Sequence, residues 1–178
     1  TQAMAAHMVA LNLAAAAFMI PLGIAAAAAT RVGNLLGAGE PWVVSAWLAV
    51  GLGAGVMCVS GALFLLVPES LVGLYTDDPK VVVLAAALLP IAALFQVADG
   101  VQAVAGGVLR GLADVRVPAV VLVVSYWLLG LPLGAWWAVD GGLGPQGVWW
   151  GLVLALSLTA VAFCLRLGAL QRRGVERI

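Results

Sequence analysis

Three polar side chains stand at a spacing of three within the apolar stretch LFQVADGVQAV, residues 94–104. They are Gln96, Asp99 and Gln102, and residues three apart are neighbours on one side of a helix. An acid inside a membrane span costs roughly 2.5–3.5 kcal/mol on insertion scales, so its presence indicates a function. The pattern predicts that Asp99 binds a proton or a metal cation, with both amides able to hydrogen-bond the carboxyl and supply further oxygens. A structural carboxyl bonded to neighbouring helices is the alternative.

Further polar residues lie in two other apolar runs. In AAHMVALN, His7 lies near one end of its run and is a candidate proton relay. The alternative is that it only hydrogen-bonds a neighbouring helix. Asn12 lies deeper, and we expect it to line the same cavity as Asp99. Tyr126, in VSYWLLG, is a further candidate lining residue for that cavity.

The composition indicates the class of protein that carries these residues. Hydrophobic residues make up 65% of the chain, charged residues only 9%, and the mean hydropathy is +1.16, whereas a soluble domain carries about 25% charged residues. The apolar runs are too long, and alternate too little, for the strands of a membrane barrel. We therefore predict an all-α, polytopic transmembrane helix bundle. The net charge of zero gives no reason to expect nucleic acid as a partner.

Five apolar runs are long enough to cross a bilayer. The predicted spans are residues 3–30, 42–66, 80–109, 118–138 and 147–168, followed by a tail at 169–178. Pro21, Pro90 and Pro132 lie within spans and are expected to kink their helices. The chain starts without Met and inside an apolar run, so we expect it to be a piece of a longer protein.

The basic residues predict how the spans are oriented. When the connections alternate across the bilayer, every basic residue except Lys80 falls at or near the same side, and these residues are Arg31, Arg110, Arg116, Arg166, Arg172, Arg173 and Arg177. Cytoplasmic loops carry an excess of Lys and Arg, so that side, with the C-terminus, is predicted to be cytoplasmic.

Other chemistry is disfavoured by the motifs. The sequence has no G-x-S-x-G nucleophile elbow, no Gly-Lys pair of a P-loop, and a single His. The glycines of GNLLGAGE, residues 33–40, indicate a tight turn rather than a phosphate loop. Cys58 and Cys164 stand in separate spans and are predicted to be free, buried thiols. An enzyme is therefore not expected.

Several longer stretches resemble one known family. The run AAHMVALNLAAAAFMIPLGIAAAAATRVGNLLGAGE resembles the second helix of the C-terminal lobe in the multidrug and toxic compound extrusion (MATE) family, and most of all its NorM-type bacterial branch. The stretches LYTDDPKVV, LFQVADGVQAVAGGVLRG, VSYWLLGLPLG and GPQGVWWGLVLALS are similar to the following helices, in the same order. The resemblance implies helices eight to twelve of a twelve-helix, two-lobe transporter of the bacterial inner membrane.

The resemblance also implies an activity. Such transporters exchange Na⁺ or H⁺ for small organic cations, such as drugs and dyes, by alternating access, and they need no cofactor beyond the coupling ion. Asp99 stands where the family has a cation-binding carboxylate. The implied partners are the bilayer, an N-terminal lobe and a seventh helix that carries another acid. A related flippase of lipid-linked sugars is one alternative, although it would favour Arg or Lys deep in the spans. An inactive, structural membrane fragment is another.

Overall fold

The computed structural model describes residues 2–173, and nearly all of them are helical. Thr1 and residues 174–178 lie outside the described part, so the predictions for Arg177 and for half of the tail 169–178 stay untested. The elements are the helices α1 (Gln2–Ala38), α2 (Val43–Leu66), α3 (Pro68–Gly73), α4 (Pro79–Ala86), α5 (Leu89–Gly111), α6 (Arg116–Leu122), α7 (Leu131–Val139) and α8 (Pro145–Arg173), with the π-helix η1 (Val123–Gly130) between α6 and α7.

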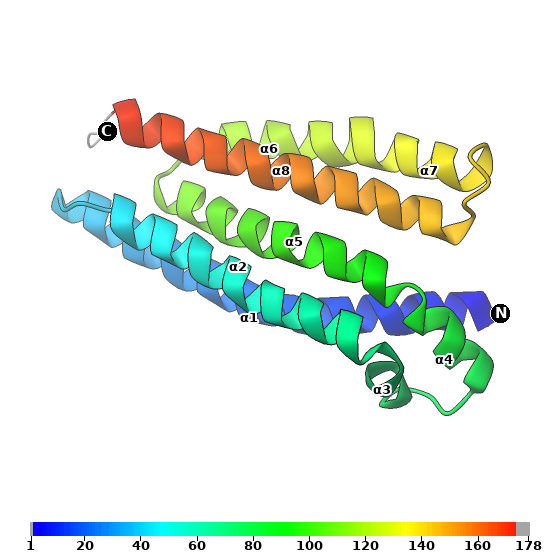
Figure 1. The fold of residues 1–178 in the computed structure, drawn as a ribbon. Helices are drawn as coiled ribbons and strands as arrows, with labels where there is room; N and C mark the ends of the chain where they lie inside the picture. The colour runs from blue at the N-terminus through cyan, green and yellow to red at the C-terminus, as the bar shows by residue number, and fades with distance from the viewer. Residues whose placement is uncertain (1, 174–178) are drawn as a thin grey trace.

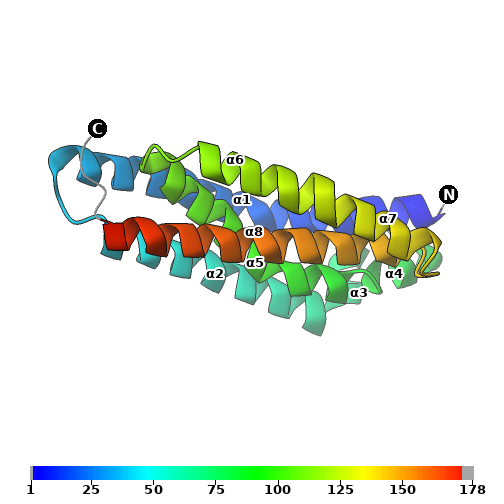
Figure 2. The same ribbon diagram turned by 90° about the horizontal axis from the view of Figure 1, so that it is seen from above.

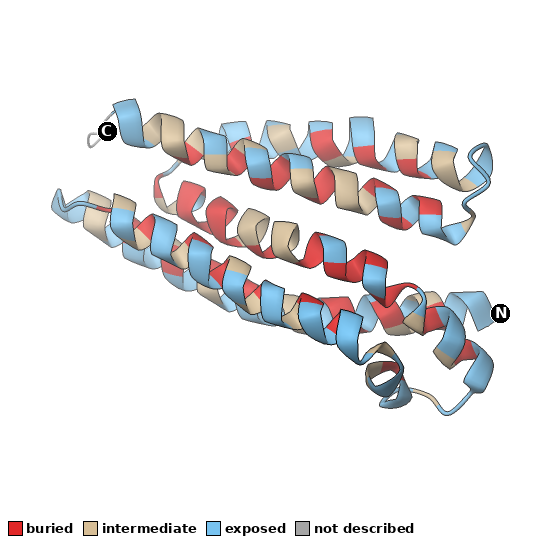
Figure 3. Ribbon diagram, viewed as in Figure 1, coloured by how far each residue is buried: buried red, intermediate tan, exposed pale blue. Residues whose placement is uncertain are grey.

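Five helical segments are long and apolar enough to cross a membrane. They are α1, α2, α5, the continuous run of α6, η1 and α7, and α8. The predicted all-α bundle is thereby confirmed. Figure 1 shows α5 in the middle, with α1 and α2 on one side of it and α6, α7 and α8 on the other. Seen from above in Figure 2, α6 and α7 lie at the opposite edge of the bundle from α2. Figure 3 shows that the outward faces of these helices are exposed, and in a membrane protein such apolar faces contact lipid.

The first helix is longer than the predicted span. It continues to Ala38, so Gly33 and Gly37 are helical and the predicted turn is shorter than GNLLGAGE. Only at Gly39 does the backbone take a positive φ, of 73°, which ends the helix as glycine commonly does. Leu35 and Leu36 explain the extension, because they pack against the hydrophobic cluster around Trp42.

The predicted third span, 80–109, is interrupted. α4 ends at Ala86 and α5 begins at Leu89. Pro90 gives the physical reason, because a proline has no N–H to donate and its ring clashes with the carbonyl four residues earlier, here Ala86. At the start of α4, the Asp78 side chain accepts a hydrogen bond of 2.9 Å from the Lys80 N–H. This is the N-cap that an Asp directly before a Pro typically forms. The membrane span itself begins one helix later than expected, at α5.

Close backbone approach places α5 among its neighbours. It packs chiefly against α2, α1 and α8. A Cβ atom on Gly107 would overlap the Ala25 carbonyl of α1, and one on Gly100 would lie 2.6 Å from Met57 Cγ of α2. Small residues at these crossings are typical of packing between membrane helices.

The arginines within residues 2–173 gather at one end of the bundle. The ends of α1, α5 and α8 and the starts of α2 and α6 lie together there, at the left of Figure 1. Hydrophobic clusters fill both halves of the bundle, one around Trp149 and one around Trp42 and Phe163. The stretch from Asp99 to Gln102 lies between the two clusters.

Candidate functional site

Helix α5 carries the three polar residues that the sequence singled out, and it is the most enclosed of the five long helices. In its most apolar window 56% of the residues are buried, against 22–39% in the other four. A polar side chain on α5 therefore faces protein or an internal cavity more often than lipid. This is the environment that an intramembrane acid requires.

Gln96 is fully buried and turns toward α2. Its Nε2 donates a hydrogen bond of 2.9 Å to Ser60 Oγ. Its Oε1 is buried and accepts no hydrogen bond within residues 2–173. An unpaired buried acceptor costs about 1–3 kcal/mol. This carbonyl oxygen is therefore chemically available to a cation or a water molecule.

Gln102 turns the other way, toward η1. Its Oε1 accepts a hydrogen bond of 2.8 Å from the Tyr126 hydroxyl. Tyr126 belongs to the π-helix, where the Leu131 N–H bonds to the Tyr126 carbonyl five residues earlier. Pro132 follows and cannot donate. π-helical segments occur frequently at functional sites.

Asp99 lies between the two glutamines on α5 and is half-buried. Within the described residues its carboxylate makes neither a hydrogen bond nor an ion pair. Both amides were expected to be able to hydrogen-bond this carboxyl, but Gln96 Nε2 donates to Ser60 instead. Gln102, whose Oε1 accepts from Tyr126, makes no bond to Asp99 within the described residues. Residues three apart are separated by about 60° around a helix, so Gln96 and Gln102 lie about 120° apart and face different neighbours. The carboxylate is left beside two amides that other helices hold in place.

His7 contacts aromatic rings rather than Asp99. Its Nδ1 accepts a hydrogen bond of 3.3 Å from the Trp149 indole N–H, and the two rings meet edge to face with centroids 5.5 Å apart. Phe95 stacks on Trp149 at 5.8 Å. Phe95 precedes Asp99 by one helical turn, so these rings lie about one turn from the acid, in the hydrophobic cluster around Trp149. This arrangement fits the neighbour-bonding alternative for His7, and a relay stays a prediction.

Asn12 is exposed on α1, and no side-chain hydrogen bond of it is found within the described chain. α1 and α5 run in the same direction, with Ala25 beside Gly107 and Ala29 beside Gly111. Asp99 is then roughly level with Ala17, about 7.5 Å further along the bundle than Asn12. No hydrogen bond joins the two residues within the described chain, and a shared cavity stays a prediction.

A cation held here would have few charged ligands. No group of three or more His, Cys, Asp or Glu side chains in residues 2–173 could hold a metal ion together. One carboxylate with neutral oxygens is a ligand set that suits a monovalent cation or a proton.

Both cysteines are free, but Cys58 is exposed on the outer face of α2, so the prediction that it is buried is wrong. Sequence reasoning also missed Ser60, a single hydroxyl in an apolar run that carries no pattern.

Comparison with known proteins identifies the family. The MatE family model matches residues 1–136. The chain belongs to the MATE family. MATE proteins are transporters rather than enzymes, in agreement with the sequence prediction.

Individual MATE proteins are similar over nearly the whole chain. "Multidrug resistance protein NorM" of Burkholderia vietnamiensis is 47% identical over 171 residues, which are 92% of this chain and 37% of that protein. "Multidrug resistance protein PmpM" of Pseudomonas aeruginosa is 39% identical over 180 residues, covering 98% and 38%. The chain thus spans little more than a third of the length of these relatives.

A solved MATE structure has the same fold. The crystal structure of the eukaryotic MATE transporter AtDTX14 matches with a TM-score of 0.85 and 25% identity, over 98% of this chain and 41% of that one. The bundle of five long helices is therefore a MATE arrangement, and the chain is a multi-pass membrane protein.

Proposed function

We propose that the chain forms part of a secondary active multidrug efflux transporter, in which Asp99 binds the coupling cation, Na⁺ or H⁺. The relatives' names support multidrug transport. The observation that carries the cation site is the half-buried carboxylate of Asp99 on the central helix, without a partner in residues 2–173. On either side of it stand Gln96, held by Ser60, and Gln102, held by Tyr126.

The coupling between ion and drug is a competition. A cation on Asp99 neutralises the carboxylate, which then attracts an organic cation less. Binding of either ligand therefore weakens binding of the other, which is a negative coupling free energy between two sites. Opposed binding of this kind lets an inward ion gradient drive a drug outward while two lobes rock about the site.

The direction of transport follows from the orientation. We place the arginine-rich end of the bundle in the cytoplasm of a bacterial inner membrane, by the positive-inside rule. An exchange in which one more elementary charge enters than leaves gains about 2.3 kcal/mol per 100 mV, enough for a roughly fifty-fold gradient of the expelled drug.

The distribution of charge favours a cationic cargo. The described arginines of the long helices lie toward one end of the bundle, and Arg166 of α8 is paired with Asp114 at 2.6 Å. A flippase of lipid-linked sugars would need exposed positive charge facing the cargo's pyrophosphate. Asp99, an acid on the central helix, attracts a cation instead.

Efflux of a fluorescent cationic dye from cells that express the full-length protein tests the proposal. Asp99→Asn should abolish export while membrane insertion stays normal. Asp140→Asn is the matched control, because it makes the same change in an exposed turn at the other end of the bundle. If Asp99→Asn exports dye at the parental rate, the assignment is wrong. Collapsing the sodium and proton gradients separately then identifies the coupling ion.

A further inference from the structure

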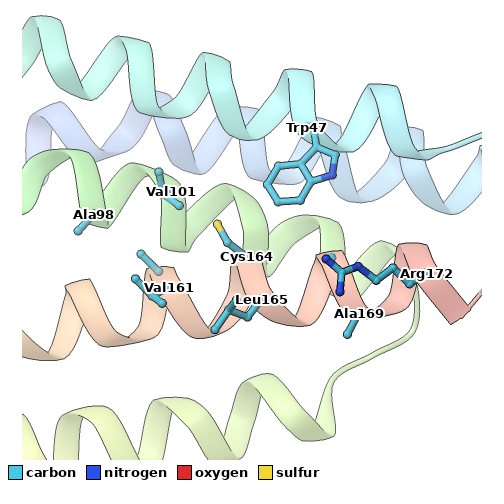
Figure 4. A pocket seen from close by; sticks show the side chains of 10 residues that line it. Trp47, Ala98, Val101, Val161, Cys164, Leu165, Ala169 and Arg172 are labelled. Carbon is cyan, nitrogen blue, oxygen red and sulfur yellow. The ribbon is translucent and has the colours of Figure 1, made fainter.

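A groove on the side of α5 that faces away from Asp99 is not explained by transport at that residue. It has a volume of about 530 Å³ and lies between α2, α5 and α8. Figure 4 shows Ala98 and Val101 of α5 on one side of it and Val161, Cys164 and Leu165 of α8 on another. Asp99 and the two glutamines do not line it.

The walls of the groove are apolar and open outward. Val161 is 59% exposed and Leu165 is 70% exposed, so the rim faces the hydrocarbon of the bilayer. Gly168 leaves space in the wall, because a Cβ atom there would meet nothing within 4 Å. A hollow of this kind in a membrane protein is filled by an acyl chain or by another helix.

One end of the groove is polar. Arg172, in the last turn of α8, lines it together with Trp47 of α2. The Trp47 indole N–H donates a hydrogen bond of 3.1 Å to Gln171 Oε1, which ties the start of α2 to the end of α8. In Figure 4 the Arg172 guanidinium points back along α8 toward Trp47. Tryptophan and arginine together are typical of the membrane interface.

The charge of Arg172 is not neutralised by the described chain. The ion pair found within residues 2–173 joins Arg166 to Asp114, and no carboxylate there pairs with Arg172. The groove therefore ends in a cationic group at the height of the lipid headgroups. An organic cation would be repelled at this end, whereas a phosphate would be attracted.

We propose that this groove binds an anionic phospholipid of the cytoplasmic leaflet. An acyl chain lies along Ala98, Val101 and Leu165, and the phosphate contacts Arg172 beside Trp47. Basic pockets between membrane helices on the cytoplasmic side bind anionic headgroups in this way. The bound lipid joins the ends of α2 and α8 outside the cation site, so its binding does not depend on Asp99.

The test is lipid binding to the full-length protein in detergent, measured by native mass spectrometry with dioleoyl phosphatidylglycerol and dioleoyl phosphatidylcholine. The wild-type protein should bind the anionic lipid roughly fivefold more tightly, the size expected of one basic residue at the membrane surface. Arg172→Gln should remove this preference. Arg173→Gln, the matched control, changes a neighbouring arginine that does not line the groove and should retain it.

A second pair of variants tests the groove itself. Gly168→Leu should fill it and weaken binding of both lipids several-fold. Gly51→Leu makes the same change at an α2 position that is also free of contacts but does not line the groove, and it should have no effect. If Arg172→Gln does not purify as a monodisperse protein, the two glycine variants by themselves test whether lipid occupies the groove.

Four results would overturn the proposal. Equal losses in Arg172→Gln and Arg173→Gln would indicate general surface charge. Lipid binding that is unchanged in Gly168→Leu would show that the groove is not occupied by lipid. Destabilisation of Gly168→Leu without added lipid would indicate that a helix of the protein occupies the groove. Displacement of the lipid by glycerol 3-phosphate would indicate a site for a free anion.

Discussion

The Tyr126 hydroxyl and Gln102 Oε1 are joined by a hydrogen bond of 2.8 Å that connects η1 to α5. This contact links the π-helical segment to the helix that carries Asp99, one turn away from the acid. It fixes the direction of the Gln102 amide, and with it one side of the candidate cation site.

Tyr126→Phe should therefore loosen the site without disrupting the bundle. The change leaves Gln102 Oε1 without its donor and should lower stability by about 0.6–1 kcal/mol, the usual value for a hydrogen bond between membrane helices. Dye export should fall, because the Gln102 amide is no longer held. Thermal unfolding of the purified protein and dye efflux measure the two effects.

Tyr75→Phe is the matched control for that variant. Tyr75 is 49% exposed beyond α3 and makes no side-chain hydrogen bond with the described chain, so the same loss of a hydroxyl should change neither quantity. Equal effects of the two variants would remove Tyr126 from the account of the site.

Changes at Gln96 and Ser60 should separate stability from transport. Ser60→Ala leaves the buried Gln96 Nε2 without an acceptor and should cost about 1–3 kcal/mol. Gln96→Leu removes the whole amide, including the unpaired Oε1, and should cost less stability than Ser60→Ala because no buried amide is left unpaired. If Oε1 is a cation ligand, Gln96→Leu nevertheless weakens transport. A Gln96→Leu protein that is stable and exports dye normally would show that this oxygen is not used.

Asp114 and Arg166 form an ion pair of 2.6 Å between the α5–α6 connection and α8, and their side chains are 12% and 29% exposed. Asp114→Asn removes one charge and should lower stability by about 1–3 kcal/mol, less than for a fully buried pair because water reaches Arg166. Salt screens this partly exposed pair, so a higher ionic strength should lower the stability of the wild-type protein and should have a smaller effect on the variant. Unfolding at two ionic strengths measures both quantities, and identical stability of the two proteins would contradict the prediction.

The crossing of α1 and α5 depends on the absence of a side chain at Gly107. Gly107→Ala places a methyl group against the Ala25 carbonyl, so the helices must separate and the protein should be destabilised by roughly 1–3 kcal/mol. Gly23→Ala is the control on α1, since its Cβ would meet nothing within 4 Å. Thermal unfolding should distinguish the two variants clearly.

Hydropathy predicts the helical class and the number of long helices because a bilayer demands long apolar runs. The N-cap at Asp78 also follows from the local sequence, since Asp directly before Pro is typical of a helix start. The interruption at Ala87–Leu88 was expected only as a kink at Pro90. The extension of α1 to Ala38 depends on tertiary contacts of Leu35 and Leu36, which no local pattern reveals.

At the candidate site the spacing of three places Gln96, Asp99 and Gln102 on adjoining faces of α5, and this much follows from helix geometry. The partners of the two amides do not follow from it. Ser60 and Tyr126 come from other helices, and η1 is a π-helix that depends on Pro132 and on the close approach of Gly130 to α8. The role of Asp99 as a cation site stays a prediction.

Displacement of a bound drug by the coupling cation, measured on the purified full-length protein, tests the central claim most directly. A fluorescent organic cation is bound first, and Na⁺ or acid is then added at constant ionic strength. The account predicts that one of them releases the dye from the wild-type protein and that Asp99→Asn loses this release while Asp140→Asn keeps it. Equal release from Asp99→Asn and the wild-type protein would contradict the account.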